Sequence, residues 1–379
     1  MKKTFDEVVL FARTGLNPRQ NFKLGQGKNK YITIKNIKNN TLVVDDNTDV
    51  VDDDAIKLIH KRSQIKKGDI LFASIGRMGD MYIIEKEPVG WDINESVFAF
   101  TLNTNIVRQK YFYYIFKVKS TLDYLASNSS GSTFKSIKMN QLKRMVFDIP
   151  SLKEQDSIIT ILDKVCNVIE MRKRELGSLD ELIKARFVEM FGDPVANDMG
   201  WDTLPLENVC KAIVDCPHST PSYTNEDTGF MCIRTSIVKK NKILWDDIEY
   251  ISEDEFAKRI QRKKPEVGDI VYTREGAILG IAAIIDRDCN VALGQRSMLL
   301  SPDIDKCTSE FLCVAMNSDS FLDNALRGVS GSASPHINVG DIKAFKMIMP
   351  PIELQEQFSD FVKQVDKSKV TKQIDSHIS

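Results

Sequence analysis

The sequence offers few residues at spacings that support catalysis. Its four histidines, at positions 60, 218, 336 and 377, lie far apart, and none forms a metal-binding spacing such as HExxH. It contains neither a phosphate-binding GxxxxGK(S/T) loop nor a GxSxG nucleophile motif. We therefore predict no catalytic residue, no metal site and no cofactor, and a chain that binds a ligand without converting it.

Basic side chains gather in stretches rich in turn-forming residues. The net charge is −1, but residues 1–40 carry nine Lys or Arg against two acidic residues, and residues 129–145 carry four bases and no acid. A local basic surface of this kind can bind phosphates even on a neutral molecule. An ordinary solvated face is the alternative explanation for each run taken alone.

Contacts with nucleic acid need Arg, Lys, Asn, Gln or hydroxyl groups on loops or strand ends, and the turn-rich stretches supply them. Several of these side chains could instead fix their own loops, because Ser and Asn favour turns. The candidates are Arg13, Asn17, Arg19, Lys23, Lys35, Asn36, Ser74, Arg77, Ser132, Thr133 and Lys135 in the first half, and His218, Ser219, Thr220, Arg234, Thr235, Arg274, Ser332, Ser334 and His336 in the second.

These stretches correspond to one another because the sequence repeats itself. Gly68 of GDILFASIG and Gly268 of GDIVYTREG lie 200 residues apart, and so do the SGS sequences that begin at Ser130 and Ser330. Further matches follow in the same order along each half. A repeat this long indicates a duplicated domain rather than a solenoid.

Each copy has the same internal plan. Short β-rich runs such as KYITIKNI and DILFAS are bounded by Gly, Asn and Asp. A helical piece, the Ser/Gly loop and a short apolar run ending at Pro150 or Pro350 follow. Each copy then closes with a strongly helical segment.

The helical segment of the first copy has the period of a coiled coil. About 40 residues at 1.5 Å each give a rod of roughly 60 Å, which is longer than a domain of about 150 residues and needs a partner helix. The second copy offers a stripe of Leu354, Phe358, Phe361 and Val365 for this pairing. The apolar residues of the first segment recur every seven positions, at Leu162, Ile169, Leu176, Ile183 and Met190.

Length and composition place the chain among globular proteins. The 379 residues suggest two or three domains. The chain lacks an apolar run long enough to span a membrane, and Asp6 and Glu7 interrupt the region where a signal peptide would need one. Its seven cysteines form no CxxC pair, and we expect them to be reduced core residues of a cytoplasmic protein.

The order of these motifs resembles the specificity subunit of type I restriction-modification systems. The resemblance covers essentially the whole chain, and it is most specific where each Ser/Gly loop leads into a helix, in SSGSTFKSIKMNQLKRMVFDIPSLKEQ and in SGSASPHINVGDIKAFKMIMPPIELQEQ. It implies an α+β fold with two β-rich target recognition domains in a pseudo-two-fold repeat, joined by long helices that form an antiparallel coiled coil. The implied divisions are target recognition domains at 1–150 and 194–350, a central helix at 151–193 and a second helix at 351–379.

The resemblance also implies partners. Each recognition domain would bind one half of a bipartite site in double-stranded DNA, and the helices would set the spacer between the halves. Two modification subunits would carry the adenine methyltransferase activity, and restriction subunits would add ATP-driven translocation and cleavage. This chain would be a non-catalytic subunit without a membrane association.

Aligning the two copies predicts different half-sites. YITIKNI resembles FMCIRTSI, which aligns Lys35 with Arg234. Different side chains on a shared frame predict that the two halves of the target differ. The pairs that differ are Asn36 and Thr235, Ser74 and Arg274, and Phe134 and Ser334.

One departure and several alternatives remain open. The second helix ends about 28 residues after Pro351, so it is apparently short, and the family's usual tail resembling LIKARFVEMFGDP is missing there. The spacer length and the docking of a second modification subunit therefore stay in question. The alternatives are the recognition part of another DNA methyltransferase or restriction assembly, a coiled-coil scaffold without a DNA role, and an enzyme of unknown kind.

Overall fold

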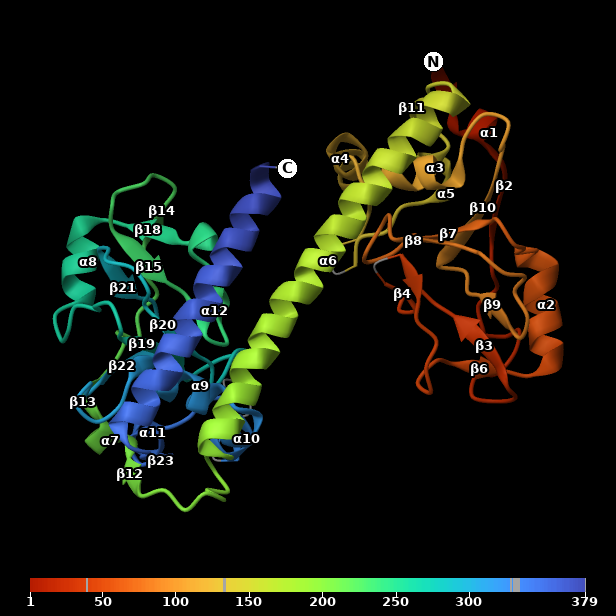
Figure 1. The fold of residues 1–379 in the computed structure, drawn as a ribbon. Helices are drawn as coiled ribbons and strands as arrows, with labels where there is room; N and C mark the ends of the chain where they lie inside the picture. The colour runs from red at the N-terminus through yellow and green to blue at the C-terminus, as the bar shows by residue number, and fades with distance from the viewer. Residues whose placement is uncertain (39, 132–133, 328, 330–334, 379) are drawn as a thin grey trace. The chain divides into compact units, whose positions relative to one another are not determined.

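The computed structural model describes residues 1–38, 40–131, 134–327, 329 and 335–378, and side chains as far as residue 369. The chain forms two compact units, Met1–Val168 and Ile169–Ser379 (Figure 1). The long helix α6, Leu152–Phe191, begins in the first unit and ends in the second.

A four-stranded antiparallel sheet forms the centre of the first unit. Strand β10 (Val97–Leu102) pairs with β2 (Val9–Thr14) on one side and with β7 (Ile70–Ala73) on the other, and β8 (Met81–Ile83) pairs with β7. All four residues of β7 are buried. A continuous apolar run such as ILFA suits a strand that is covered on both faces.

A second sheet joins β3 (Asn29–Ile32) in parallel to β9 (Trp91–Ile93) and antiparallel to β6 (Val50–Val51). The remaining elements of this unit are β1 (Lys2–Thr4), α1 (Phe5–Val8), β4 (Ile37–Lys38), β5 (Thr41–Leu42), α2 (Asp53–Ser63), α3 (Gln109–Ile115), α4 (Lys119–Ser127), α5 (Met139–Leu142) and β11 (Val146–Asp148).

Phenylalanine rings fill the core between this sheet and the helices. The ring centroids of Phe5 and Phe100 are 5.5 Å apart, and those of Phe112 and Phe147 are 5.7 Å apart, both in edge-on geometry. Phe72 stands 5.6 Å from Phe100. Edge-on contacts between rings add stability beyond the apolar area that they bury.

The second unit repeats this plan. Strand β22 (Ser297–Pro302) lies between β13 (Cys210–Asp215) and β19 (Ile270–Thr273), and β20 (Ala282–Ile284) follows β19 at the edge. The position of each strand in this sheet matches the position of its counterpart in the first unit. The duplication that the sequence predicts is therefore confirmed as a duplicated fold.

The second sheet of this unit has the order β14-β18-β15-β21, and β15 and β21 are parallel, as β3 and β9 are. The bounds of these strands are β14 (Tyr223–Thr224), β15 (Met231–Ile233), β18 (Glu249–Ile251) and β21 (Val291–Leu293), and the unit also contains β12 (Thr203–Pro205), α7 (Leu206–Val209), η1 (Thr235–Ile237), β16 (Val238–Lys239), β17 (Lys242–Ile243), η2 (Trp245–Asp247), α8 (Glu253–Arg259), α9 (Ser309–Asn317), α10 (Asp319–Leu326), α11 (Val339–Lys343), β23 (Lys346–Ile348) and α12 (Ile352–Ile378).

The register of the parallel strands corrects part of the sequence alignment. Ile32 pairs with Ile93 in the first unit, and Ile233 pairs with Leu293 in the second, so Ile32 corresponds to Ile233. The offset here is 201 residues rather than 200. The alignment of Lys35 with Arg234 is therefore wrong by two positions, and the counterpart of Arg234 is Thr33.

The turns after these strands agree with the corrected register. The N–H of Asn36 donates to the carbonyl of Thr33, and the N–H of Ile237 donates to the carbonyl of Arg234. Asn36 thus corresponds to Ile237 and not to Thr235. The first unit has one residue more than the second between these turns and Gly68, and this residue changes the offset from 201 to 200.

The final turns of α6 pack antiparallel against α12 inside the second unit. The ring centroids of Phe187 and Phe191 each lie 5.5 Å from that of Phe358. Farther along, Lys369 Nζ on α12 lies 2.8 Å from Asp180 Oδ1 on α6. Residue numbers fall on one helix as they rise on the other, as expected for antiparallel helices.

The heptad pattern predicts this contact only in part. Ile183 is buried, but Ile169 is 48% exposed. Phe187 and Phe191, outside the predicted seam, are buried instead. The spacing of Ile183, Phe187 and Phe191 is four residues, which suits a helix that packs on a globular core around large rings better than a coiled-coil seam.

Two further findings concern membranes and cysteines. Within the described part of the chain, every helix is too short or too polar to cross a membrane. All seven cysteines are free, and Cys210, Cys216, Cys232, Cys307 and Cys313 are buried. The expectation that all seven belong to the core is wrong for Cys166, which is exposed on α6.

Candidate nucleic-acid interface

The Ser/Gly loop of the first unit returns to the end of strand β7. The N–H of Ile137 donates to the carbonyl of Ser74 at 2.9 Å, and the N–H of Gly76 donates to the carbonyl of Lys135 at 2.9 Å. These bonds bring Arg77 and Lys135 to one end of the β7–β8 hairpin, and both side chains are exposed.

Ser74 links the end of β7 to the residue before β10. Its side chain is buried, and its hydroxyl donates to the carbonyl of Ser96 at 2.7 Å. The structure thus joins Ser74 to the Ser/Gly loop through its carbonyl and gives its hydroxyl a local partner. Contact between Ser74 and a ligand stays a prediction.

Arg13 is held inside the first unit. Its guanidinium donates to the carbonyl of Gln64 and to the carboxylate of Asp69, each at 3.0 Å. Burial raises the pKa of Asp69, while the hydrogen bond from Thr101 and the charge of Arg13 act against that rise. Arg13 thus stabilises a buried carboxylate, a role that the sequence did not reveal.

The other candidates of the first unit divide into loop-forming and exposed residues. The Asn36 amide donates to the carbonyl of Val43 at 3.0 Å, and its oxygen accepts from the N–H of Thr33 at 2.9 Å. Asn17 accepts a hydrogen bond from the side chain of Asn21. The exposed basic residues, which remain available for phosphates, are Arg19, Lys23 and Lys35.

The second unit brings corresponding segments together. The N–H of Ile337 donates to the carbonyl of Arg274, and the N–H of Gly276 donates to the carbonyl of Pro335. A bridge between Glu275 and His336 repeats the bridge between Ile75 and Ser136. The two Ser/Gly loops are therefore attached in the same way, and the pairing of Ser74 with Arg274 at an offset of 200 is correct.

Arg274 is bound within the unit rather than free at the surface. Its Nε and Nη2 donate to the two carboxylate oxygens of Asp215 at 2.9 and 3.1 Å. The same carboxylate lies 3.2 Å from Nε2 of His218, whose side chain is exposed. A bidentate pair of this kind is strong and specific in geometry, so the base contact that the sequence predicts for Arg274 would require this pair to open.

A shallow pocket of about 230 Å³ lies beside this group. Arg234 lies over the ring of Tyr223, 5.6 Å from its centroid, and pairs with Glu249 at 2.9 Å. The hydroxyl of Thr220 donates to the side chain of Gln295 at 2.6 Å. The pocket is lined by Thr220, Tyr223, Arg234, Thr235, Ser236, Gln295 and Arg296.

Tyr223, Gln295 and Arg296 were missed by sequence reasoning. Gln295 and Arg296 lie between β21 and β22, and their counterparts Glu95 and Ser96 carry a carboxylate and a hydroxyl in place of the amide and the guanidinium. Arg296 is exposed and has a φ of 73°, a left-handed conformation that is uncommon for residues other than glycine. An Arg next to a Gln in a turn between two apolar runs is the signal that could have identified them.

The remaining candidates either have local partners or lie outside the described residues. The backbone carbonyl of Ser219 accepts from Arg259 at 2.8 Å. His336 belongs to the bridge with Glu275. Ser132, Thr133, Ser332 and Ser334 lie outside the described residues. Among the described residues, no group of three or more His, Cys, Asp or Glu could hold a metal ion.

Comparison with known proteins identifies the family. The model of the type I restriction modification DNA specificity domain matches residues 1–180 and again residues 199–379. The chain therefore belongs to the type I restriction-modification specificity family, and it contains two copies of the family's domain.

Individual relatives agree with this assignment. The chain is 21% identical over 329 residues to the type I restriction enzyme MjaVIII specificity subunit of Methanocaldococcus jannaschii, which covers 82% of this chain and 75% of the relative. It is 24% identical over 327 residues to the MjaIX specificity subunit of the same organism, with 81% and 73% covered. A crystal structure of the type I restriction-modification S subunit from M. genitalium shares the fold, with a TM-score of 0.52, 15% identity and coverage of 100% of this chain and 92% of that one.

Proposed function

We propose that this chain is the DNA-specificity subunit of a type I restriction-modification complex. Its two units would bind the two halves of a bipartite site in double-stranded DNA. The observation that carries this proposal is the matching attachment of the Ser/Gly loop in each unit, at Ser74 and at Arg274, with different side chains around it. A shared frame with different polar groups suits two half-sites of different sequence.

The chain would be the non-catalytic member of the complex. Two modification subunits would transfer methyl groups to adenine, and restriction subunits would supply ATP-driven translocation and cleavage. The names of the relatives, which are specificity subunits, support this division of labour. The helices α6 and α12 are the elements that we expect to carry the docking surfaces and to set the spacer.

Co-expression with the matching modification subunit, followed by mapping of methylated adenine across a genome, tests the proposal. We expect one bipartite motif whose two halves differ in sequence. Exchange of residues 199–379 for the corresponding segment of a relative should change one half of the motif and leave the other unchanged. A perfectly palindromic motif would contradict the assignment of different half-sites to the two units.

A coiled-coil scaffold without a DNA role is the main alternative. DNA binding through phosphate contacts weakens steeply as salt rises, because bound counterions are released on association. A gel shift with the modification subunit present should therefore lose affinity as the salt concentration increases. Equal, weak binding to DNA with and without the mapped motif would favour the scaffold.

A further inference from the structure

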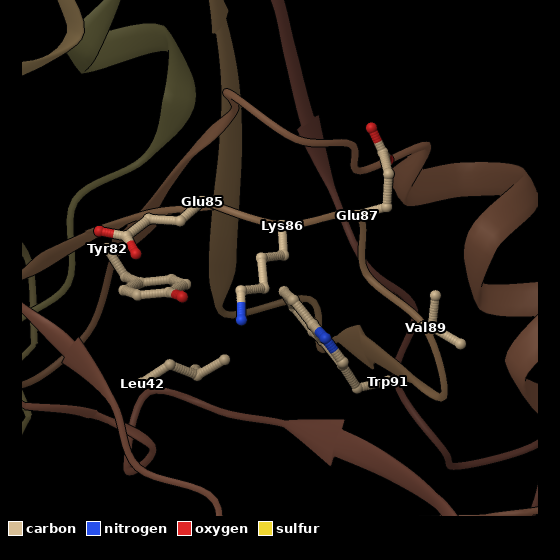
Figure 2. Close-up of a pocket in the computed structure, with 7 residues that line it drawn as sticks. All are labelled: Leu42, Tyr82, Glu85, Lys86, Glu87, Val89 and Trp91. Atoms are coloured by element: carbon tan, nitrogen blue, oxygen red, sulfur yellow. The ribbon is translucent and has the colours of Figure 1, made fainter.

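A pocket of about 410 Å³ lies in the first unit at the connection from β8 to β9. Figure 2 shows the amine of Lys86 directed between the ring of Tyr82 and the indole of Trp91, with Leu42 nearby. We call this the Tyr82–Trp91 pocket. It is lined by Leu42, Tyr82, Glu85, Lys86, Glu87, Val89 and Trp91.

The Tyr82–Trp91 pocket lies apart from the candidate nucleic-acid interface of the same unit. Arg77 lies in the turn that joins β7 to β8, whereas the pocket lies where the chain leaves β8 at its other end. Its lining residues include two acids, Glu85 and Glu87, and one base, Lys86, although the Glu87 carboxylate points away from Lys86 and accepts from the N–H of Lys67 at 3.3 Å. This charge disfavours a polyanion such as DNA.

The second unit has an equivalent location, and the register identifies it. Asn40 and Asn241 occupy the left-handed turn position of equivalent hairpins, with φ of 64° and 63°. Leu42 then corresponds to Ile243, because each is the last residue of its hairpin strand. Two residues later, Val44 corresponds to Trp245.

Trp245 is bound by two neighbouring side chains in the second unit. Its indole N–H donates to Asp286 at 2.8 Å, and the Arg287 guanidinium lies 4.5 Å from the centroid of its ring. A guanidinium at this distance over an indole makes a favourable cation–π contact. Trp245 also packs against the apolar core cluster of this unit.

The first unit keeps this binding pair but carries a smaller side chain in place of the indole. Gly68 donates to the carbonyl of Ile84, as Gly268 does to that of Ile285, so Glu85 corresponds to Asp286 and Lys86 to Arg287. Val44, the counterpart of Trp245, is 45% exposed. The walls of the pocket are aromatic in the first unit, because Tyr82 and Trp91 occupy the positions of Ala283 and Val291 in the second unit.

We propose that the Tyr82–Trp91 pocket binds a tryptophan side chain of a partner protein. The indole N–H would donate to Glu85, and the Lys86 ammonium would lie over the ring, as Asp286 and Arg287 hold Trp245. The excess of carboxylates favours basic residues beside that tryptophan. This interaction goes beyond the proposed DNA specificity and does not depend on it.

Capped tripeptides provide the probe for this site. Saturation-transfer NMR with the full-length chain should detect Lys-Trp-Lys, with protons of the indole showing the strongest transfer. Glu-Trp-Glu should bind at least about tenfold more weakly, equivalent to about 1.4 kcal/mol. Lys-Leu-Lys should show no saturable binding. Adenosine or thymidine binding as tightly as Lys-Trp-Lys would overturn the proposal in favour of a nucleobase site.

A substitution taken from the second unit supplies the decisive variant. Val44→Trp should place an indole in the pocket from within and weaken Lys-Trp-Lys binding at least about tenfold. Val267→Trp is the matched control, because Val267 is 58% exposed on the other unit and the variant should bind the peptide as the wild type does. Unchanged peptide binding by Val44→Trp would refute the proposal.

Two additional measurements keep the result interpretable. Glu85→Ala removes both the acceptor proposed for the indole N–H and one negative charge, leaves the aromatic walls in place, and should also weaken Lys-Trp-Lys binding, so the test does not depend on one variant. Salt-dependent binding of the DNA target, with the modification subunit present, should be the same for Val44→Trp and wild type. Failure of tryptophan docking and failure of DNA specificity would thus be seen in separate measurements.

Discussion

Gln155 and Gln355, 200 residues apart, make the same three hydrogen bonds at the start of α6 and of α12. The oxygen of Gln155 accepts from the N–H of Arg108 at 2.8 Å, and its amide donates to the carbonyls of Ile106 and Pro150. Gln355 accepts from the N–H of Thr308 at 3.1 Å and donates to the carbonyls of Lys306 and Pro350.

Both side chains are fully buried. Each amide therefore joins the loop before a helix of its unit to the first turn of the long helix. Because the three bonds join separate backbone groups to one side chain, they fix where that helix starts in its unit.

Replacement of either glutamine by alanine should be strongly destabilising. It leaves one buried N–H and two carbonyls without their partner, at about 1–3 kcal/mol for each group that stays dry. We expect Gln155→Ala to lower the free energy of unfolding by at least about 2 kcal/mol in urea titration. The exposed Gln20→Ala should change it by less than about 0.5 kcal/mol, and equal effects of the two substitutions would disprove the role of the bonds.

Phe187 should contribute far more to stability than the heptad residue Ile169. Its ring is buried and contacts both Phe311 and Phe358, so Phe187→Ala should cost about 3–5 kcal/mol. Ile169 is 48% exposed, and Ile169→Ala should cost less than about 1 kcal/mol. Chemical denaturation of the two variants measures the difference. A larger loss of unfolding free energy for Ile169→Ala than for Phe187→Ala would favour packing through the heptad residues.

Long-range order in the sequence predicted the fold better than local detail did. Repeated anchors such as Gly68 and Gly268 revealed the duplication, and each of these glycines has a positive φ and lies two residues before an equivalent buried strand. The one-residue change of offset could not be seen, since strands of similar composition align almost equally well at neighbouring registers. The pairing of Ile233 with Leu293 resolves it.

The sequence named the candidate residues but did not show which of them meet. Ser74, Arg274 and the two Ser/Gly loops were separate candidates, and the structure joins each residue to the loop of its own unit. The sequence did not show that Arg274 pairs with Asp215, because those residues lie 59 positions apart and meet only when β13 and β19 join the same sheet. Gln295 and Arg296 were missed for another reason. Their counterparts in the first copy have different chemistry, so comparison of the two copies did not point to this position.

Glu7 should make stability depend on pH in the acid range. Its pKa falls from a usual value of 4.5 to about 2, chiefly because the N–H of Thr4 donates to the carboxylate, with help from Lys3. A lowered pKa means that the contribution is complete above pH 4.5 and is lost as pH falls toward 2.

Glu7→Gln removes the charge that responds to pH. The wild type should therefore lose more melting temperature than Glu7→Gln between pH 4.5 and pH 2. Thermal unfolding at several pH values measures this slope, with Glu207→Gln, at the corresponding short helix of the second unit, as control. Parallel curves for wild type and Glu7→Gln would show that the hydrogen bond from the N–H of Thr4 to the Glu7 carboxylate is absent in solution.

Arg296 and Arg274 should affect DNA recognition in different ways. Arg296 is exposed beside the pocket of Tyr223 and Gln295, so on the proposed function its removal should relax one base of the second half-site, at a cost of about 1–3 kcal/mol for the preferred base. Arg274 holds Asp215 inside the unit, so Arg274→Lys should lower thermal stability and leave the methylated motif unchanged.

Mapping of methylated adenine after co-expression with the modification subunit distinguishes the two outcomes. Lys211→Ala, at the other end of β13, serves as the control for loss of a surface charge and should leave the motif unchanged. A relaxed motif in Arg274→Lys with an intact one in Arg296→Ala would reverse the assignment. In that case the pair with Asp215 would have to open on binding, and Arg274, not Arg296, would contact the base.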